Sequence, residues 1–235
     1  MRDPAEFIRS NTTLMPVPLV PEIRLHLAEE SLPIWQKTEE ELGVMNVPPP
    51  YWAFAWAGGQ ALARYLLDHP AVVAGRRVID LGSGSGLTAI AARKAGAAHV
   101  LATDIEAYAL AAIGLNGAAN GMTVEVSRQD PLAAPAGAFD VVLAGDMFYE
   151  RPLAERVLAF LDAAAKSGAH VLVGDPGRNY FPKDRFRQVA AYSVPVTREL
   201  EDAEIKRTAV WELVPLSPRI ADASASAISA GKGSG

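Results

Sequence analysis

The chain has 235 residues, of which 50% are hydrophobic and 21% charged, the composition of an ordinary globular protein. It has no cysteine, and no two of its four histidines stand at a metal-ligand spacing, so the sequence excludes a disulfide framework, a thiol nucleophile and a histidine-based metal centre. The net charge of −5 has the wrong sign for bulk attraction to nucleic acid or to an anionic membrane.

The start of the chain, MRDPAEFIRS, has neither the apolar core of a signal peptide nor the acid-poor composition of a transit peptide. The longest uncharged stretch, residues 107–124, contains two asparagines and three glycines, which argues against a membrane span. We therefore expect a cytoplasmic protein without a metal, a nucleic-acid partner or a membrane partner.

Residues 1–50 differ from the rest of the chain in charge and in proline content. They hold four Lys and Arg against eight Asp and Glu, and they end in three consecutive prolines. Residues 23–27 alternate between apolar and polar, which predicts a short half-buried strand, and residues 31–42 resemble a short acidic helix. We expect residues 1–50 to form an extension that packs on the main domain.

From residue 51 onward, short apolar runs alternate with segments of helical pattern. The expected helices are 57–67, 87–95, 107–120, 152–166 and 184–191, and the expected strands are 76–83, 99–104, 123–129, 139–146, 170–176, 193–200 and 205–214.

Strands that alternate with helices indicate a parallel sheet covered on both faces. Five such strands, followed by two extended runs separated by the charged EDAE, predict a seven-stranded α/β sheet that ends in an antiparallel hairpin. Residues 217–235 are small, polar and aperiodic, so we expect them to be disordered. The main domain is then residues 51–216, and we expect a monomer.

The segment VIDLGSGSG, residues 78–86, carries the most specific motif. It follows the first strand of the regular region, and ligands of open α/β sheets sit beyond the carboxyl ends of the strands. A dinucleotide fingerprint, G-x-G-x-x-G, counted from Gly82 requires glycine at position 87, where the chain has Leu87. The observed D-x-G-x-G-x-G is the pattern of S-adenosylmethionine (SAM) methyltransferases, and Asp80 suits the ammonium and sulfonium of SAM. The alternative is a glycine-rich turn with a helix-capping Asp.

Two further acids end the next strands. Asp104 lies 18 residues after Gly86, where an acid can accept hydrogen bonds from both hydroxyls of a ribose. Asp130 ends the third strand, where it either accepts from the amino group of adenine or, before Pro131, begins a turn. The predicted cofactor-binding residues are Trp56, Asp80, Gly82, Ser83, Gly84, Asp104, Ile105, Asp130 and Asp146.

The fourth strand ends in the pentapeptide DMFYE, residues 146–150, where the methyl group of SAM would project. Two carboxylates suit an amine nucleophile, which arrives as a cation and must lose a proton. We therefore predict catalytic roles for Asp146, Tyr149 and Glu150, with a simple helix start at Glu150 as the alternative.

The segment YWAFAWAGGQ, residues 51–60, concentrates aromatic side chains. Aromatic faces attract a sulfonium or a methylammonium by cation–π interaction. We assign this role to Trp56, directly before Gly58-Gly59, and interpret Trp52 and Phe54 as a hydrophobic plug over the sheet. The pairs Asp175-Pro176 and Tyr180-Phe181 are candidates for the rim of the site.

Together these motifs resemble the family 16-type protein methyltransferases, and most of all the electron transfer flavoprotein β-subunit lysine methyltransferases, including their bacterial members. The resemblance covers residues 7–215. DLGSGSG identifies only the cofactor class. The specific segments are FIRSNTTLMPVPLVPEIRLHLAEE, PPPYWAFAWAGGQALARYLLD and DMFYE.

The resemblance implies a Rossmann-like seven-strand fold, SAM as cofactor and lysine methylation of the electron transfer flavoprotein β-subunit. The family motif D-x-F-Y-D/E at the target lysine maps onto residues 146–150, with Glu150 one methylene longer than Asp. The acidic run Glu39–Glu41 would help to dock a lysine-bearing face. The alternatives are ribosomal protein L11 or a small amine as the target, a SAM-binding module without catalysis, and a nicotinamide-dependent oxidoreductase, which Leu87 disfavours.

Overall fold

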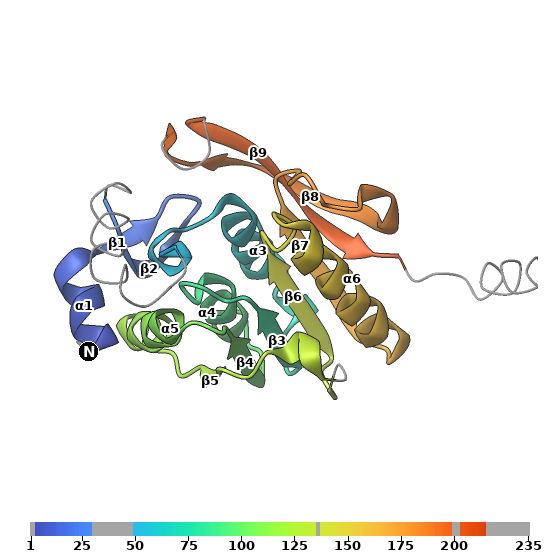
Figure 1. The fold of residues 1–235 in the computed structure, drawn as a ribbon, viewed down its shortest axis with the longest axis horizontal. Helices are drawn as coiled ribbons and strands as arrows, with labels where there is room; N and C mark the ends of the chain where they lie inside the picture. Colours follow the sequence, from blue (N-terminus) through green and yellow to red (C-terminus); the bar gives the residue numbers. More distant parts are fainter. Residues whose placement is uncertain (1–2, 30–48, 135–136, 199–202, 215–235) are drawn as a thin grey trace, which may run out of the picture.

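A computed structural model describes residues 3–29, 49–134, 137–198 and 203–214. Its centre is a seven-stranded sheet in the order β5-β4-β3-β6-β7-β9-β8 (Figure 1). The first five strands in this order are parallel, and β9 pairs antiparallel with both β7 and β8, so the predicted sheet with its terminal hairpin is confirmed. The strands are β3 (Arg77–Leu81), β4 (His99–Thr103), β5 (Glu125–Ser127), β6 (Val141–Gly145), β7 (His170–Asp175), β8 (Phe186–Pro195) and β9 (Ile205–Leu213).

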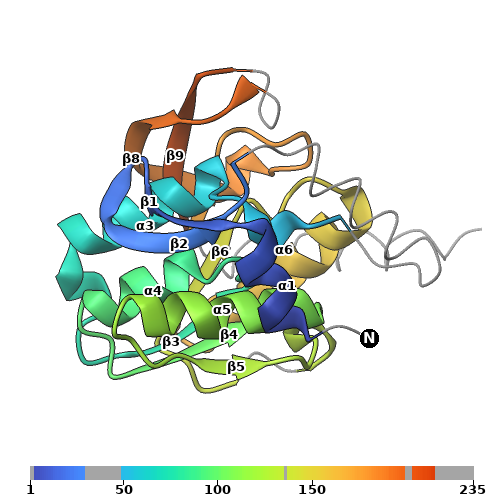
Figure 2. The ribbon, with the colours of Figure 1, turned by 90° about the vertical axis from the view of Figure 1, so that its left-hand side faces the viewer.

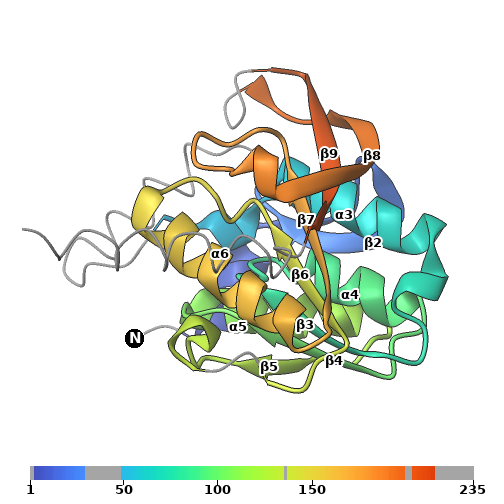
Figure 3. The same cartoon turned by 90° about the vertical axis from the view of Figure 1, so that its right-hand side faces the viewer.

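Helices cover both faces of the sheet: α3, α4 and α5 on one face and α6 on the other (Figures 1 and 3). Successive side chains of the central strands point to opposite faces, so Val78 and Leu143 pack beneath α3 and α4, while Ile79 and Val142 pack beneath α6. Strands buried on both faces need such continuous apolar runs. The helices are α3 (Ala57–Asp68), α4 (Leu87–Lys94), α5 (Ala107–Ala119) and α6 (Arg151–Lys166), with 3₁₀ turns at Tyr51–Ala53, Pro70–Val72, Pro131–Ala133 and Lys183–Arg185.

The predicted helix at 184–191 is wrong, because β8 begins at Phe186. The residues of β8 pair with β9 from Phe186 to Pro195, with a bulge between Gln188 and Ala190. Phe186 and Val194 are buried at its two ends. Alanine and glutamine favour a helix in isolation, but here the pairing with β9 and the burial of these apolar side chains outweigh that weak preference.

The N-terminal residues form α1 (Pro4–Asn11) and a two-stranded antiparallel sheet of β1 (Thr13–Val17) and β2 (Val20–Leu27). This segment lies against α4 and α5 (Figure 2). The predicted strand at 23–27 is therefore part of β2, whereas β1 was not predicted. The predicted helix at 31–42, the acidic run Glu39–Glu41 and the tail at 217–235 lie outside the described residues.

Asn116 in α5 and Asn120, which caps the end of that helix, join this N-terminal sheet to the main domain. The Asn120 side chain bonds both the N–H and the carbonyl oxygen of Arg24, at 3.0 and 2.6 Å. One turn earlier, the fully buried Asn116 accepts from the His26 N–H at 2.7 Å and donates to the Ser85 carbonyl at 2.8 Å. A continuous chain of hydrogen bonds thus runs from β2 to the loop that follows β3.

A membrane-spanning helix would have to be both long and apolar, and no helix in the described part of the chain meets this requirement.

Candidate functional site

The glycine loop, residues 82–86, turns the backbone sharply at the carboxyl end of β3. Gly82, Gly84 and Gly86 have φ angles of 57°, 52° and 82°, in the left-handed region that favours glycine. The Ser83 N–H donates to the Thr103 carbonyl at 2.9 Å, which ties the loop to β4. Gly86 is also the residue that precedes α4. The alternation of glycines in D-x-G-x-G-x-G is therefore a requirement of this backbone path.

A cavity of about 420 Å³ lies beyond the carboxyl ends of β3, β4 and β6, a size that suits a small-molecule ligand. Every predicted cofactor-binding residue lines this cavity, and so does Tyr149. Glu150 and residues 175–176 and 180–181 are not among its walls. The structure thus brings together the glycine loop, the acids after β4 and β5, and the start of the DMFYE segment.

Asp80 is buried at the base of the glycine loop. Its carboxylate accepts a 2.5 Å hydrogen bond from the Ser83 hydroxyl. Burial raises the pKa of Asp80 to about 7, although the bonds from Ser83 and from the Ala89 N–H in the first turn of α4 oppose this. A cation bound in the cavity would therefore favour the ionised form of Asp80.

Asp104 directly follows β4, lines the cavity, and joins two segments of its wall by hydrogen bonds. Its two oxygens accept the N–H groups of Gly84 and Glu106, each at 3.0 Å, so the side chain clamps the glycine loop to the start of α5. Burial raises the pKa of Asp104, and burial together with the charge of Asp104 raises the pKa of Glu106 to about 7. The cavity therefore contains three carboxyl groups with raised pKa values, those of Asp80, Asp104 and Glu106.

Asp130 begins a turn, which is one of the two interpretations that the sequence left open. Its side chain accepts the Leu132 N–H at 2.9 Å and so begins the 3₁₀ turn, and it also forms an ion pair with Arg156. At the same time it lines the cavity. A turn-forming role does not prevent it from contacting a ligand.

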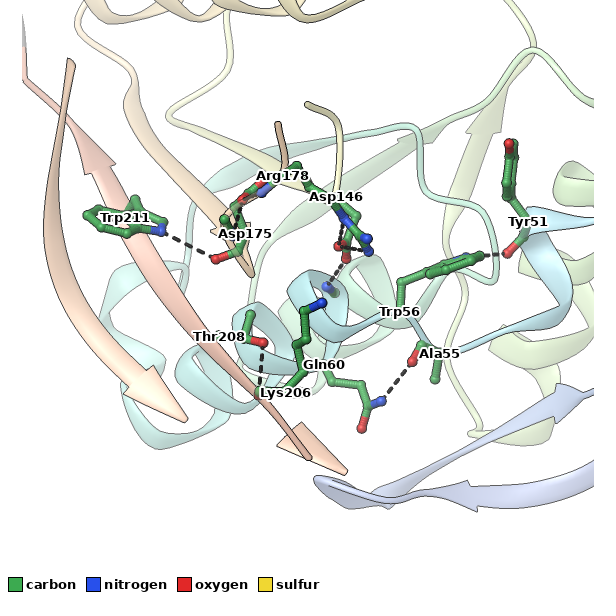
Figure 4. A network of polar contacts seen from close by, with 12 residues as sticks. Tyr51, Ala55, Trp56, Gln60, Asp146, Asp175, Arg178, Lys206, Thr208 and Trp211 are labelled. Atoms are coloured by element: carbon green, nitrogen blue, oxygen red, sulfur yellow. Dashed lines mark hydrogen bonds and ion pairs between the residues drawn. The ribbon is translucent and has the colours of Figure 1, made fainter. Parts of the chain in front are cut away.

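Asp146 adopts a backbone conformation that is uncommon for a residue other than glycine, with a φ of 56°. Two groups hold it there: its N–H donates to the Gly174 carbonyl, and its Oδ2 accepts the Gly59 N–H, both at 3.0 Å. Its Oδ1 accepts Nη2 and Nε of Arg178, at 2.7 and 3.1 Å (Figure 4). Strain of this kind persists only where the surroundings determine it, and it concentrates at functional sites.

The Gly58-Gly59 pair allows α3 to approach the carboxyl ends of β6 and β7. A Cβ at Gly58 would overlap the Gly174 carbonyl oxygen and the Asp146 carboxylate, whereas a Cβ at Gly59 would meet only Leu87 and Thr88 at ordinary contact distance. Glycine at position 58 therefore positions Asp146, rather than contacting a ligand itself.

Gly58→Ala should destabilise the protein by about 2–3 kcal/mol, because the added methyl group has to displace backbone atoms. Gly59→Ala is the matched control, since alanine in an open helical position stabilises by about 0.5–1 kcal/mol. Urea unfolding of the two variants tests this difference. Equal stability of both would show that α3 does not pack as closely on β7 as described.

Aromatic side chains form the entrance of the cavity. The ring of Tyr51 lies 5.9 Å from Trp56 and 5.8 Å from Tyr149, between centroids. The Trp56 indole N–H donates to the Tyr51 carbonyl at 2.9 Å, which fixes its orientation. Trp52 and Phe54 are buried, as a plug requires, yet both also line the cavity.

Tyr149 and Glu150 lie at the mouth of the cavity, at the start of α6. Burial, with the nearby Tyr51 and Glu150, raises the pKa of Tyr149 to about 12, so this phenol is neutral and cannot serve as a base near pH 7. Glu150 is exposed, and its charge also raises the pKa of Tyr51. The carboxylate of Glu150 therefore lies within electrostatic reach of both tyrosines without being part of the wall.

The residues of this site that the sequence did not indicate include Arg178, Glu106 and Met147. All three line the cavity, and the Met147 sulfur packs where Gly82 lacks a Cβ. Arg178 had a detectable signal, since a cation three residues after a strand that ends in Asp is well placed to neutralise the acids of neighbouring strands. Among the described residues, no three His, Cys, Asp or Glu side chains gather as a metal site.

Known proteins resemble this chain over most of its length. The family model of ribosomal protein L11 methyltransferase (PrmA) matches residues 60–169. The electron transfer flavoprotein beta subunit lysine methyltransferase of Mus musculus is 41% identical over 203 residues, which cover 84% of this chain and 78% of the mouse protein. The Xenopus laevis protein of the same name is 37% identical over 218 residues, 90% of this chain and 87% of its own length. The chain belongs to the electron transfer flavoprotein β-subunit lysine methyltransferase family.

The predicted family of methyltransferases is thereby confirmed. The fold of this family member also matches the magnesium protoporphyrin IX methyltransferase of Synechocystis PCC 6803, with a TM-score of 0.51 over 80% of this chain and 99% of that protein. The sequence identity is 19%, so this likeness concerns the fold. It supports the predicted Rossmann-like methyltransferase sheet.

Proposed function

We propose that this member of the electron transfer flavoprotein β-subunit lysine methyltransferase family transfers methyl groups from SAM to lysine ε-amino groups of that β-subunit. One observation carries the proposal: a single cavity joins the glycine loop and Asp104 to Asp146 and Tyr149. The names of relatives that match more than three quarters of the chain support the choice of substrate. The match to the ribosomal protein L11 family spans a shorter region, residues 60–169.

The cavity residues fit SAM group by group. In this proposal Asp104 would accept from the ribose hydroxyls, Asp80 and the glycine loop would hold the amino-acid end, and Asp130 would accept from the adenine amino group. Trp56 offers an aromatic face to a sulfonium. When bound, SAM supplies an electrophilic methyl group. A dinucleotide would need glycine where the chain has Leu87, which is buried in α4.

The remaining task of the chain is to present a neutral lysine in the right direction. A free lysine has a pKa of ~10.4, so holding it neutral at pH 7 costs about 4.6 kcal/mol. We assign to exposed Glu150 the attraction of the ammonium at the mouth, and to Tyr149 the alignment of the amine by its hydroxyl group. Asp146 fixes the end of β6 and the start of α3, and so keeps the amine in line for displacement.

We expect the affinity for SAM to fall as the pH is lowered through about 7. The pKa values of Asp80 and Glu106 are raised to about 7, mainly by burial, and a cationic ligand favours their ionised forms. The free protein must then release protons to bind SAM at pH 6, so each such proton raises the Kd by about tenfold per pH unit below 7. Calorimetry from pH 6 to 8.5 tests this, with Asp80→Asn expected to flatten the dependence. A Kd independent of pH would contradict it.

The raised pKa of Asp80 also affects the stability of the free protein. A carboxyl whose pKa rises from 3.8 to about 7 on folding binds its proton more tightly in the folded state. The contribution of Asp80 to the free energy of unfolding therefore decreases as the pH rises from 3.8 to about 7, and it is constant above that range.

Binding assays separate this function from its alternatives. SAM should bind by calorimetry and NAD should not. Tritium from labelled SAM should then appear in purified β-subunit and not in ribosomal protein L11 or a free amine. Binding of SAM without transfer to any of these would favour a binding module, and binding of NAD alone would favour an oxidoreductase.

We further propose that residues 51–216 form the methyltransferase domain and that residues 1–50 form an extension packed on it. The hydrogen bonds of Asn116 and Asn120 to β2 support this division. We also propose a monomer that acts without a nucleic-acid or membrane partner, in line with the net charge of −5. Light scattering of the purified protein tests the oligomeric state.

A further inference from the structure

Arg178 contacts two groups of the cavity wall that attract cations, the Asp146 carboxylate and the Trp56 ring. Its Nη2 and Nε donate to one oxygen of Asp146, at 2.7 and 3.1 Å. Its guanidinium carbon lies 5.7 Å from the centre of the Trp56 ring, on the aromatic face (Figure 4). The carboxylate and the indole that the sequence assigned to the methyl-transfer end are thus already in contact with a cation of the chain itself.

The end of β7 fixes Arg178 in this place. Asp175 is 1% exposed, and its Oδ1 accepts the N–H groups of Gly177 and Arg178, at 2.6 and 2.7 Å. Gly177 has a φ of 93°, which turns the chain back toward the cavity. The side chains of Arg178 and Asp146 are 20% and 11% exposed, so the pair is sheltered from solvent at the wall of the cavity. Such a pair is screened far less than a surface ion pair.

Carboxyl groups outnumber cations in the wall of the cavity that holds this pair. The wall contains Asp80, Asp104, Glu106, Asp130 and Asp146, against Arg156 and Arg178. Asp175 lies beside the pair at the end of β7, Glu150 lies beside Tyr149 at the mouth, and the Lys206 side chain extends toward the pair from β9 (Figure 4). An excess of carboxylates favours the protonated form of an amine. The nucleophile in methyl transfer is the neutral amine, which is about one part in 2,500 of free lysine at pH 7.

We propose that Arg178 is a positioning residue whose charge cancels that of Asp146, so that the site receives lysine as a neutral amine rather than holding it as an ammonium. The inference rests on the proposed lysine methylation. The lysine gives its proton to solvent at the mouth, its lone pair forms the nitrogen–carbon bond as the carbon–sulfur bond of SAM breaks, and the methylated product loses its second proton to solvent.

The pH profile of single-turnover methylation tests this role. In Arg178→Gln the inflection should move up by about one pH unit, so that the rate at pH 7 falls about tenfold and recovers near pH 9. Arg178→Lys keeps the charge and should keep the wild-type inflection. Arg185→Gln is the matched control, because Arg185 forms a similarly sheltered pair with Asp162, at 2.6 Å, outside the cavity. It should leave the inflection unchanged.

A second readout does not depend on activity. The carboxyl carbon of Asp146, followed by NMR in the free protein, should titrate at higher pH in Arg178→Gln than in the wild type, and should return toward the wild-type value in Arg178→Lys. An unchanged inflection and an unchanged titration in Arg178→Gln overturn the inference. A wild-type enzyme that methylates no lysine defeats the proposed function instead, and the titration then still decides whether Arg178 neutralises Asp146.

Discussion

Asp146→Asn should lower kcat at pH 7 by on the order of 100-fold or more, which is within the usual range for a positioned polar group in an active site. The carboxylate of Asp146 joins the Gly59 N–H to Arg178, and it holds a backbone with φ of 56° in place. The single oxygen of an amide can accept from only one of these two donors, and it carries no charge, so either the Gly59 N–H or the Arg178 guanidinium loses its fixed partner. Single-turnover rates with saturating SAM measure the effect.

The affinity for SAM should change less than threefold in this variant, because the proposed binding mode puts Asp146 near the methyl group of SAM and away from its ribose. Asp140→Asn is a suitable control: Asp140 accepts the Arg77 N–H at 2.8 Å just before β6, at the opposite end of that strand. It should leave kcat near the wild-type value. Near-normal turnover of both Asp146→Asn and Glu150→Gln would remove these acids from the mechanism and leave Tyr149 as the residue to test.

Asp104→Ala should raise the Kd for SAM about 10- to 150-fold, equivalent to about 1.5–3 kcal/mol for the loss of charge-assisted hydrogen bonds. Two effects add here. The ribose loses its acceptor, and the glycine loop loses the bond from the Gly84 N–H to the Asp104 carboxylate. Calorimetry with SAM measures the change.

Asp104→Asn separates the two effects, because the amide oxygen can still accept one of the two backbone N–H groups. Its Kd should lie between those of the wild type and the alanine variant. Glu106→Gln should have a smaller effect than either, since Glu106 is bound to Asp104 through its backbone N–H alone. An unchanged Kd in Asp104→Ala would exclude Asp104 from the cofactor site.

The parallel strands and the glycine loop could be predicted from the sequence because their physical requirements are local. A strand buried on both faces needs an apolar run such as that of β6, and a backbone with φ of 57°, 52° and 82° at alternate positions needs the three glycines of the loop. The acids of the cavity could also be predicted, because each directly follows a parallel strand. The carboxyl ends of parallel strands all lie on the same side of the sheet, so residues that follow these strands lie close together.

The features that were missed depend on which segments pair with one another. β8 has a sequence compatible with a helix and becomes a strand because β9 pairs with it. β1 contains Pro16 and is stabilised by its pairing with β2. The ion pair of Arg178 with Asp146 joins positions 32 residues apart, so the local pattern that points to a cation after β7 does not show which acid it pairs with. Likewise, Glu150 follows Tyr149 directly, yet only Tyr149 lies in the wall of the cavity.

Mass spectrometry of lysine methylation tests the central claim most directly. Purified electron transfer flavoprotein is incubated with this enzyme and with SAM that carries a heavy methyl group, and its peptides are then sequenced. We expect heavy methyl groups on lysines of the β-subunit with the wild-type enzyme, and almost no heavy methyl groups with Asp146→Asn. Unlabelled β-subunit, together with labelled ribosomal protein L11 under the same conditions, would contradict it.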